Sequence, residues 1–196
     1  MNRDELAKAV RQELPKNRWE HTLRVVDTAL ELADRYGADA EKADRAALLH
    51  DFCKYWSRER MEAIIRRGGP PQDLLQHNLQ LWHAFVGAEV VQEQFGITDS
   101  EILDAIRYHT SGRPHMSLLD KVIFLADYIE PGRRFPGISE VRELAREDLD
   151  KAVLKSLENT LIFLIQRGHK VYPLTMAARN DMVDRVRRPS SKEESS

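Results

Sequence analysis

The sequence predicts an all-α fold, and three observations support this prediction. Apolar residues recur at steps of three and four, so that they line one face of a helix. Within residues 17–36 these positions are Trp19, Leu23, Val26, Leu30 and Ala33. No segment keeps the period-two alternation of a strand for long. Glycines and prolines, which break helical hydrogen bonding, gather between the apolar segments. These breaks are GGPP at 68–71, SGRP at 111–114 and EPGRRFPG at 130–137.

The individual helices follow from where the apolar periodicity starts and stops. The first strongly amphipathic helix covers residues 17–36 and is expected to end at Gly37, because glycine readily leaves the helical conformation. In chain order, the expected helices cover residues 3–14, 17–36, 40–54, 58–67, 81–95, 99–109, 118–129, 139–146, 149–167 and 174–187. We therefore expect a helical bundle.

The length of the chain indicates one domain. Its 196 residues are enough to bury a sizeable core and fall within the usual size of a single domain. We expect this domain to cover residues 1–188. The last residues, 189–196, are PSSKEESS, which is small and polar throughout, so we expect them to form a disordered tail.

Composition disfavours several classes of protein. Thirty basic and 32 acidic side chains leave a formal charge of −2, whereas nucleic-acid-binding proteins usually carry a basic surface. The single cysteine, Cys53, cannot form an intrachain disulfide and is what a reducing compartment allows. The N-terminus mixes charges, and the apolar runs are too short to cross a bilayer. We expect a cytoplasmic protein whose main partner is neither nucleic acid nor membrane.

The most informative positions are those where polar residues interrupt an apolar segment. His50 and Asp51 directly follow the run AALL, and Asp127 lies within VIFLADYIE. A buried and unpaired carboxylate is costly, so two of them in a small protein require a shared partner. Side chains one residue apart on a helix diverge by ~100°, so His50 and Asp51 would each have to find a partner in the interior. A bound metal ion would satisfy both.

Three further histidines interrupt apolar segments. His21 lies at the margin of the apolar face of the helix 17–36, His83 lies within LWHAFVGA, and His109 follows Ile102 and Ile106 on one helix face. Any one of them taken alone is more often a hydrogen-bonded core residue than a metal ligand. Together with the two aspartates and His50 they make a set suited to a first-row divalent metal such as iron, manganese or zinc.

The order His21, His50-Asp51 and Asp127 resembles the H…HD…D signature of the HD-domain metal-dependent phosphohydrolases, which are all-helical. Within that superfamily the chain is similar to the YqeK branch, the bacterial symmetrical diadenosine tetraphosphate hydrolases. The similar blocks are EHTLRVVDTALELADRYGAD, KADRAALLHDFCK, HAFVGAEVV, IRYHTSG, LLDKVIFLADYIEPGR and VYPLTMAARN. The H…HD…D signature alone indicates the superfamily. Its combination with the blocks around His109 and Asp127 indicates the YqeK branch.

The resemblance implies a role for each matching residue. Its implied metal ligands are His21, His50, Asp51 and Asp127, holding one or two iron ions, with manganese, cobalt or zinc as substitutes. The implied nucleotide-binding residues are Asp51, Lys54, His83, His109, Thr110, Arg133, Tyr172, Pro173 and Ala177. His83 and His109 would contact phosphate or a second metal, and the segment from Tyr172 to Ala177 would lie near base and ribose. The chain could also form a homodimer, and the sequence does not decide this.

The implied reaction is hydrolysis of diadenosine tetraphosphate at its centre into two ADP. The implied catalytic residues are Asp51, Lys54, His83 and His109. We expect Asp51 to bridge metal ions or act as general base, and the basic side chains and imidazoles to neutralise charge that develops on the phosphates. A pocket for one ADP moiety would fix the site of cleavage, and the second half of the substrate would extend into solvent.

Other functions stay open at this point. An HD-domain nucleotidase acting on a (deoxy)nucleoside mono- or triphosphate would share the same skeleton, as would a guanosine tetraphosphate hydrolase. A cyclic dinucleotide phosphodiesterase is disfavoured, because VYP at 171–173 lacks the residues that complete the GYP motif of those enzymes. A nucleotide-sensing module without catalysis is the alternative from another class.

Overall fold

The computed structural model describes residues 1–187, and all of its regular elements are helices. They are α1 (Arg3–Glu13), α2 (Lys16–Tyr36), α3 (Ala40–Leu49), α4 (Arg58–Arg67), a 3₁₀ turn η1 (Gln72–Gln76), α5 (Leu79–Phe95), α6 (Ser100–Tyr108), α7 (Leu118–Ile129), α8 (Ile138–Glu147), α9 (Leu149–Gln166) and α10 (Pro173–Arg187). The all-α prediction is confirmed for this part of the chain. The predicted tail, 189–196, lies outside the described residues.

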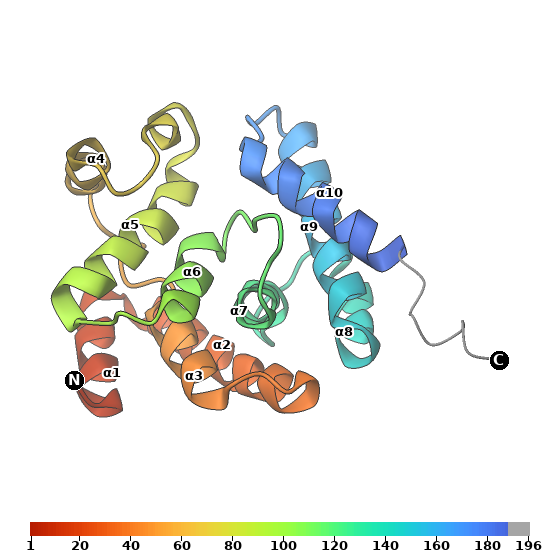
Figure 1. Cartoon of the computed structure of the whole chain (residues 1–196), viewed down its shortest axis with the longest axis horizontal. Coiled ribbons are helices and arrows are strands. Elements are labelled where there is room, and N and C mark those ends of the chain that lie inside the picture. The colour runs from red at the N-terminus through yellow and green to blue at the C-terminus, as the bar shows by residue number, and fades with distance from the viewer. Residues whose placement is uncertain (188–196) are drawn as a thin grey trace.

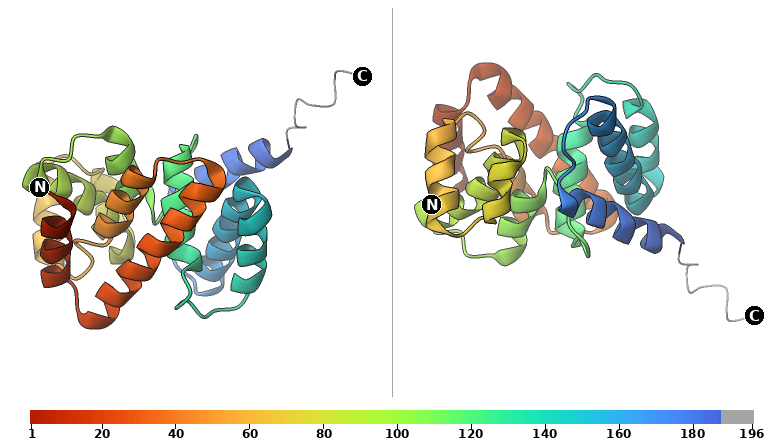
Figure 2. Two further views of the ribbon diagram at one scale, coloured as in Figure 1. Left: turned by 90° about the horizontal axis from the view of Figure 1, so that it is seen from below. Right: turned by 90° about the horizontal axis from the view of Figure 1, so that it is seen from above.

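Helix α7 lies in the middle of the molecule (Figure 1). It packs against α2, α3 and α6 on one side and against α8 and α9 on the other. Both views in Figure 2 show it between the red-to-green N-terminal helices and the blue C-terminal helices. Its sequence explains this position, because nine of its residues are buried, including Val122, Ile123 and Leu125. An element that is apolar on most of its surface must be covered on several sides.

Most helix ends fall where the sequence places them. Gly37 ends α2 in the left-handed conformation, with φ 75°, and its N–H donates to the carbonyl of Ala33. Asp39 then caps α3 by accepting from the N–H of Lys42. The three expected glycine- and proline-rich breaks are loops. The turn η1 was not expected, and it is too short to show a helical period.

The prediction of one helix over residues 40–54 is wrong. Helix α3 ends at Leu49, and residues 50–55 form consecutive tight turns in which Phe52 N–H donates to Leu49 C=O and Lys54 N–H donates to Asp51 C=O. Phe52 and Cys53 are buried although they are not helical, so the apolar pattern continues past the end of the helix. His50, Asp51 and Lys54 therefore lie on these turns and not on a helix.

Among residues 1–187, no helix is both long enough and apolar enough to cross a bilayer. The buried apolar side chains instead form one cluster that runs from α1 to α10. Cys53 belongs to this cluster, as a packing residue with no exposed surface. Burial raises the pKa of its thiol, so it is a poor nucleophile in this position.

Candidate metal centre and nucleotide pocket

Two histidines of the centre occupy equivalent positions at the ends of short helices. His50 is the C-cap of α3 and His109 is the C-cap of α6, and both keep a helical backbone. The Nδ1 atom of His50 lies 2.6 Å from the carbonyl oxygen of Ala47, and that of His109 lies 2.7 Å from the carbonyl of Ile106. A carbonyl can only accept, so each Nδ1 carries a proton, and each Nε2 presents a lone pair when the ring is neutral. That is the form in which histidine binds a metal.

His21 is positioned by a carboxylate. Its Nδ1 lies 3.0 Å from Oε1 of Glu130, whose other oxygen accepts from Nε of Arg24 and from the N–H of Gly132, both at 2.5 Å. Glu130 is almost fully buried and follows α7 directly. The carboxylate thereby fixes the ring of His21 and leaves its Nε2 pointing toward Asp127, whose Oδ1 is 3.0 Å away.

Asp51 lies at the middle of the cluster. Its side chain is fully buried, with Oδ2 3.0 Å from Nε2 of His50 and Oδ1 3.0 Å from Nε2 of His83. His21 and His109 approach the same carboxylate at 3.8 Å. The guanidinium of Arg18 pairs with Oδ2. One carboxylate is thus shared by four imidazoles from four parts of the chain.

The geometry fits a divalent cation better than it fits a hydrogen-bond network. Four buried polar atoms at the middle of the cluster lack an aligned hydrogen-bond partner among residues 1–187, although opposite charges lie near them. They are Nε2 of His21, Nε2 of His50 and both carboxylate oxygens of Asp51. Unpaired buried polar atoms are costly, and a cation would satisfy all four. The residues present therefore match the requirement of a metal.

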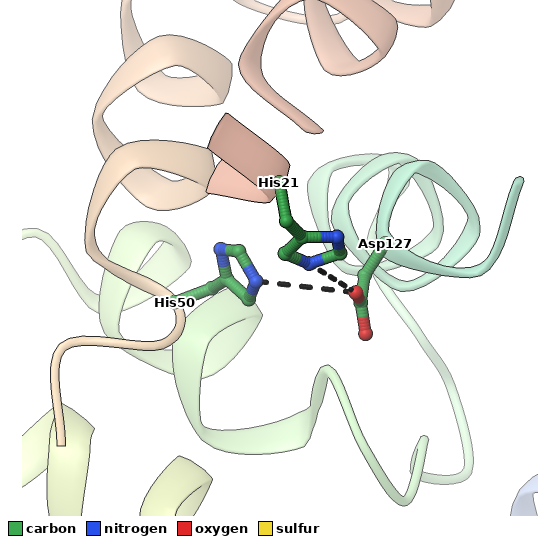
Figure 3. Close-up of side chains that lie close together, drawn as sticks. All are labelled: His21, His50 and Asp127. Atoms are coloured by element: carbon green, nitrogen blue, oxygen red, sulfur yellow. Dashed lines mark ion pairs between the residues drawn. The ribbon is translucent and has the colours of Figure 1, made fainter. Parts of the chain in front are cut away.

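Candidate ligand atoms form two overlapping groups. Donor atoms of His21, His50 and Asp127 lie within 4.8 Å of one another, and so do those of His50, Asp51 and His109. Figure 3 shows the first group, with the three side chains converging from separate helices and turns. His50 is common to both groups. Nitrogen and carboxylate donors in this number are typical of first-row divalent metals.

The protonation states of the cluster follow from burial and neighbouring charge. Burial acts to raise the pKa of Asp51, but His50 and His83 outweigh it and hold that pKa well below its usual range. The pKa of Asp127 is likewise lowered, because Arg133 and the imidazoles outweigh burial. Burial, assisted by Lys54, lowers the pKa of His83 to about 4. At neutral pH the carboxylates are ionised and His83 is neutral, so His83 can bind a ligand but cannot neutralise charge as expected above.

Lys54 reaches the centre from the turn that follows Asp51. Its Nζ lies 3.4 Å from Nε2 of His83, which in turn lies 3.1 Å from Nε2 of His109. Burial lowers the pKa of Lys54 relative to an exposed lysine. The side chain therefore places an amine at the edge of the cluster. Its backbone lies in a turn and not in a helix.

A cavity of about 380 Å³ opens beside the cluster, and we call it the inner pocket. Among the predicted nucleotide-binding residues, it is lined by Lys54, His109, Thr110 and Tyr172, together with the candidate ligand Asp127. Pro173 is exposed and Ala177 is half-buried, and neither lines this pocket. Arg133 instead pairs with Asp127, with 2.5 Å between Nη2 and Oδ1, and lines a neighbouring cavity.

Sequence reasoning missed two residues of the site. Arg18 pairs with Asp51, and Glu130 orients His21. A signal existed for both, because Arg18 precedes His21 by three residues and Glu130 follows Asp127 by three residues. Side chains three apart on a helix share a face, so a charged residue at that distance from a ligand can reach the same cluster.

Comparisons with known proteins find a matching family and similar proteins. Residues 18–132 match the family described as HD domain. The symmetrical bis(5'-nucleosyl)-tetraphosphatase of Bacillus subtilis is 52% identical over 183 residues, covering 93% of this chain and 98% of the relative. Its counterpart from Halalkalibacterium halodurans is 46% identical over the same shares. The crystal structure of a predicted HD superfamily hydrolase involved in NAD metabolism, from Clostridium acetobutylicum, superposes with a TM-score of 0.89 at 40% identity, covering 94% of this chain and 98% of that one.

Proposed function

The chain belongs to the HD domain family, and we propose that it hydrolyses diadenosine tetraphosphate at the central anhydride, releasing two ADP. The tetraphosphatase relatives match it over nearly their whole length. The observation that carries the proposal is the set of unpartnered buried atoms on His21, His50 and Asp51, which lies next to the inner pocket. A metal centre beside a cavity is the arrangement that metal-assisted hydrolysis of a phosphoric anhydride uses.

We propose that His21, His50, Asp51 and Asp127 hold the metal, and that this metal is iron. His83 and His109 would bind a second ion or a phosphate oxygen from the opposite side of Asp51. When bound by these residues, a divalent cation would lower the pKa of water and polarise the phosphoryl oxygen under attack. The first-row metals manganese, cobalt and zinc accept the same donors and would substitute for iron.

The side chains of the centre then have separate tasks. Asp51 is ionised, and it would bridge two ions or, if one ion is bound, orient the attacking water as general base. The water oxygen bonds to the second phosphorus, and the bridging oxygen leaves with the third phosphate as ADP. Lys54 and Arg133 supply positive charge to the leaving and transferred phosphates. His83 is neutral and contributes ring nitrogen contacts to the same phosphates.

The inner pocket selects the substrate. Its volume of about 380 Å³ is within the range of small-molecule sites, and Tyr172 and Thr110 line it together with the candidate metal ligand Asp127. Seating one ADP moiety there would place the second phosphate at the centre. The distance from the bound nucleoside to the metal centre would then determine which anhydride bond is cleaved.

Three finer points belong to the same proposal. The chain acts in the cytoplasm, where a reduced, buried Cys53 is stable and iron stays ferrous. Thr110 binds a phosphate or ribose oxygen, since its hydroxyl is buried without a hydrogen-bond partner in residues 1–187. Assembly into a homodimer stays a prediction, which light scattering on the purified chain would test.

An activity panel separates this proposal from an HD-domain nucleotidase. The purified chain would be given diadenosine tetraphosphate, dAMP, dATP, guanosine tetraphosphate and NAD, each with added iron, manganese or cobalt. We expect diadenosine tetraphosphate to be cleaved at least 100-fold more efficiently than the others, since the relatives are named for it. Preferential cleavage of a deoxynucleotide would establish the nucleotidase instead.

A further inference from the structure

A second cavity of about 540 Å³, which we call the outer pocket, lies beside the inner one. Its principal lining residues are Tyr128, Arg133, Phe135, Asn159, Ile162 and Phe163. They come from the end of α7, the loop that follows it, and α9. None of these residues belongs to the candidate metal ligands, so the outer pocket has no part in holding the ion.

The two pockets adjoin each other and share part of their lining. Tyr128, Thr160 and Phe163 line both of them. Phe163 is 54% exposed, which is unusual for a phenylalanine, and its neighbour Ile162 is 52% exposed. A bound molecule that leaves the inner pocket on this side would pass over Phe163 and meet the outer pocket next. Apolar surface left open at such a junction favours a ligand that covers it.

Arg133 connects the outer pocket to the metal centre. Its Nη2 donates to Oδ1 of Asp127 at 2.5 Å and its Nε donates to the carbonyl of the same residue at 3.0 Å. The same side chain lines the outer pocket and is about one-third exposed. A guanidinium therefore lies between a candidate metal ligand and the outer pocket. That is where a polyphosphate leaving the centre would need a positive charge.

The walls of the outer pocket suit a nucleobase. The rings of Tyr128 and Phe135 meet edge to face, with centroids 4.9 Å apart, and Phe163 adds a third ring. Aromatic faces bind bases by stacking. Asn159 and Gln166 also line the pocket, and carboxamides pair well with the donor and acceptor edge of adenine. The outer pocket thus combines apolar rings, amides and one cation.

We propose that the outer pocket binds the second nucleoside of a dinucleoside polyphosphate, while the inner pocket binds the first. This inference rests on the proposed function and replaces the expectation that the second half of the substrate extends into solvent. The tetraphosphate would run from the inner pocket across the metal centre and past Arg133. The protein would then recognise both ends of its substrate and prefer it to a nucleotide with one nucleoside.

Adenosine 5'-tetraphosphate tests this directly, because it carries the same phosphates and only one nucleoside. The quantity to measure is the ratio of kcat/KM for diadenosine tetraphosphate to kcat/KM for adenosine 5'-tetraphosphate, in the wild type and in Ile162→Ala and Phe135→Ala. We expect each variant to lower this ratio by about tenfold, because Phe135→Ala removes an aromatic ring from the wall and Ile162→Ala removes apolar surface that the base would cover. Ile165→Ala is the matched control, since Ile165 is exposed on the same helix and lines neither pocket, and its ratio should equal that of the wild type.

The outcomes separate the two proposals. If the wild type cleaves both substrates equally well and the variants leave the ratio unchanged, the outer pocket is not a nucleoside site, whereas the proposed function stands. A change in oligomeric state in Ile162→Ala with an unchanged ratio would assign the surface to a second copy of the chain and also overturn the inference. If the wild type cleaves neither substrate, the proposed function fails and the subsite fails with it.

Discussion

The two sides of α7 differ in what they bury. On the side of α2, α3 and α6, ionisable groups such as Asp51 and His50 are withdrawn completely from water. On the side of α9, apolar groups such as Ile162 and Phe163 are left more than half exposed. Each arrangement is unfavourable for the isolated chain, and each becomes favourable with a suitable ligand: a cation for the first and a nucleoside for the second.

The extent of the family match follows the same division. Residues 18–132 include every candidate metal ligand, and they end before α8, α9 and α10 begin. Phe163 and Tyr172, which line the pockets, lie beyond them. The family match therefore contains all of the candidate metal ligands. Part of the lining of both pockets comes from the C-terminal helices, which lie outside the match, and on our proposal these helices would determine substrate choice.

The largest expected effect on activity comes from replacing Asp51, which lies at the middle of the buried cluster. Asp51→Asn should lower kcat for diadenosine tetraphosphate by about 1,000-fold or more, because it removes the ionised carboxylate shared by four imidazoles. Steady-state kinetics with metal content measured on the same sample would check this. Asp34→Asn, on an exposed position of α2, is the control and should match the wild type.

Metal removal should destabilise the chain as well as inactivate it. Without the ion the buried atoms of His21, His50 and Asp51 have no aligned partner, so binding at a 100-fold excess over Kd would stabilise the fold by about 2.7 kcal/mol. Thermal melts of the chelated chain with and without added manganese would measure the shift in Tm. The Tm of Asp51→Asn should respond much less, and an equal response would place the ion elsewhere.

Glu130→Gln should have an intermediate effect, because Glu130 touches His21 and not the metal or substrate. We expect metal affinity to fall about 10- to 100-fold, as for other residues that orient a ligand histidine. At saturating metal, activity should largely recover, which a merely misfolded variant would not do. Metal titration with an activity readout measures both, with the exposed Glu147→Gln as control.

The smallest effect should come from the exposed side. Phe163→Ala should raise KM for diadenosine tetraphosphate by about tenfold and change kcat by less than about threefold, since stacking is lost while the centre is untouched. Because Phe163 is exposed, the substitution should leave Tm unchanged. A loss confined to kcat would contradict the division of labour between the two sides.

The sequence predicted the buried residues on one side of α7 better than the exposed residues on its other side. A His or Asp inside an apolar segment is visible in one dimension, so all candidate ligands could be named in advance. The end of α3 at Leu49 could not, because Phe52 and Cys53 are buried without being helical. Ile162 and Phe163 continue the apolar pattern of α9, and only the three-dimensional packing reveals that they are exposed beside a cavity.

The identity of the products of diadenosine tetraphosphate tests the central claim most directly. Chromatography of the reaction of the wild type, His50→Ala and Asp51→Ala would be followed over time. We predict that the wild type forms ADP alone, two molecules for each substrate consumed, and that both variants form almost none. AMP together with ATP would contradict central cleavage, and ADP formation retained by either variant would remove the buried centre from the reaction.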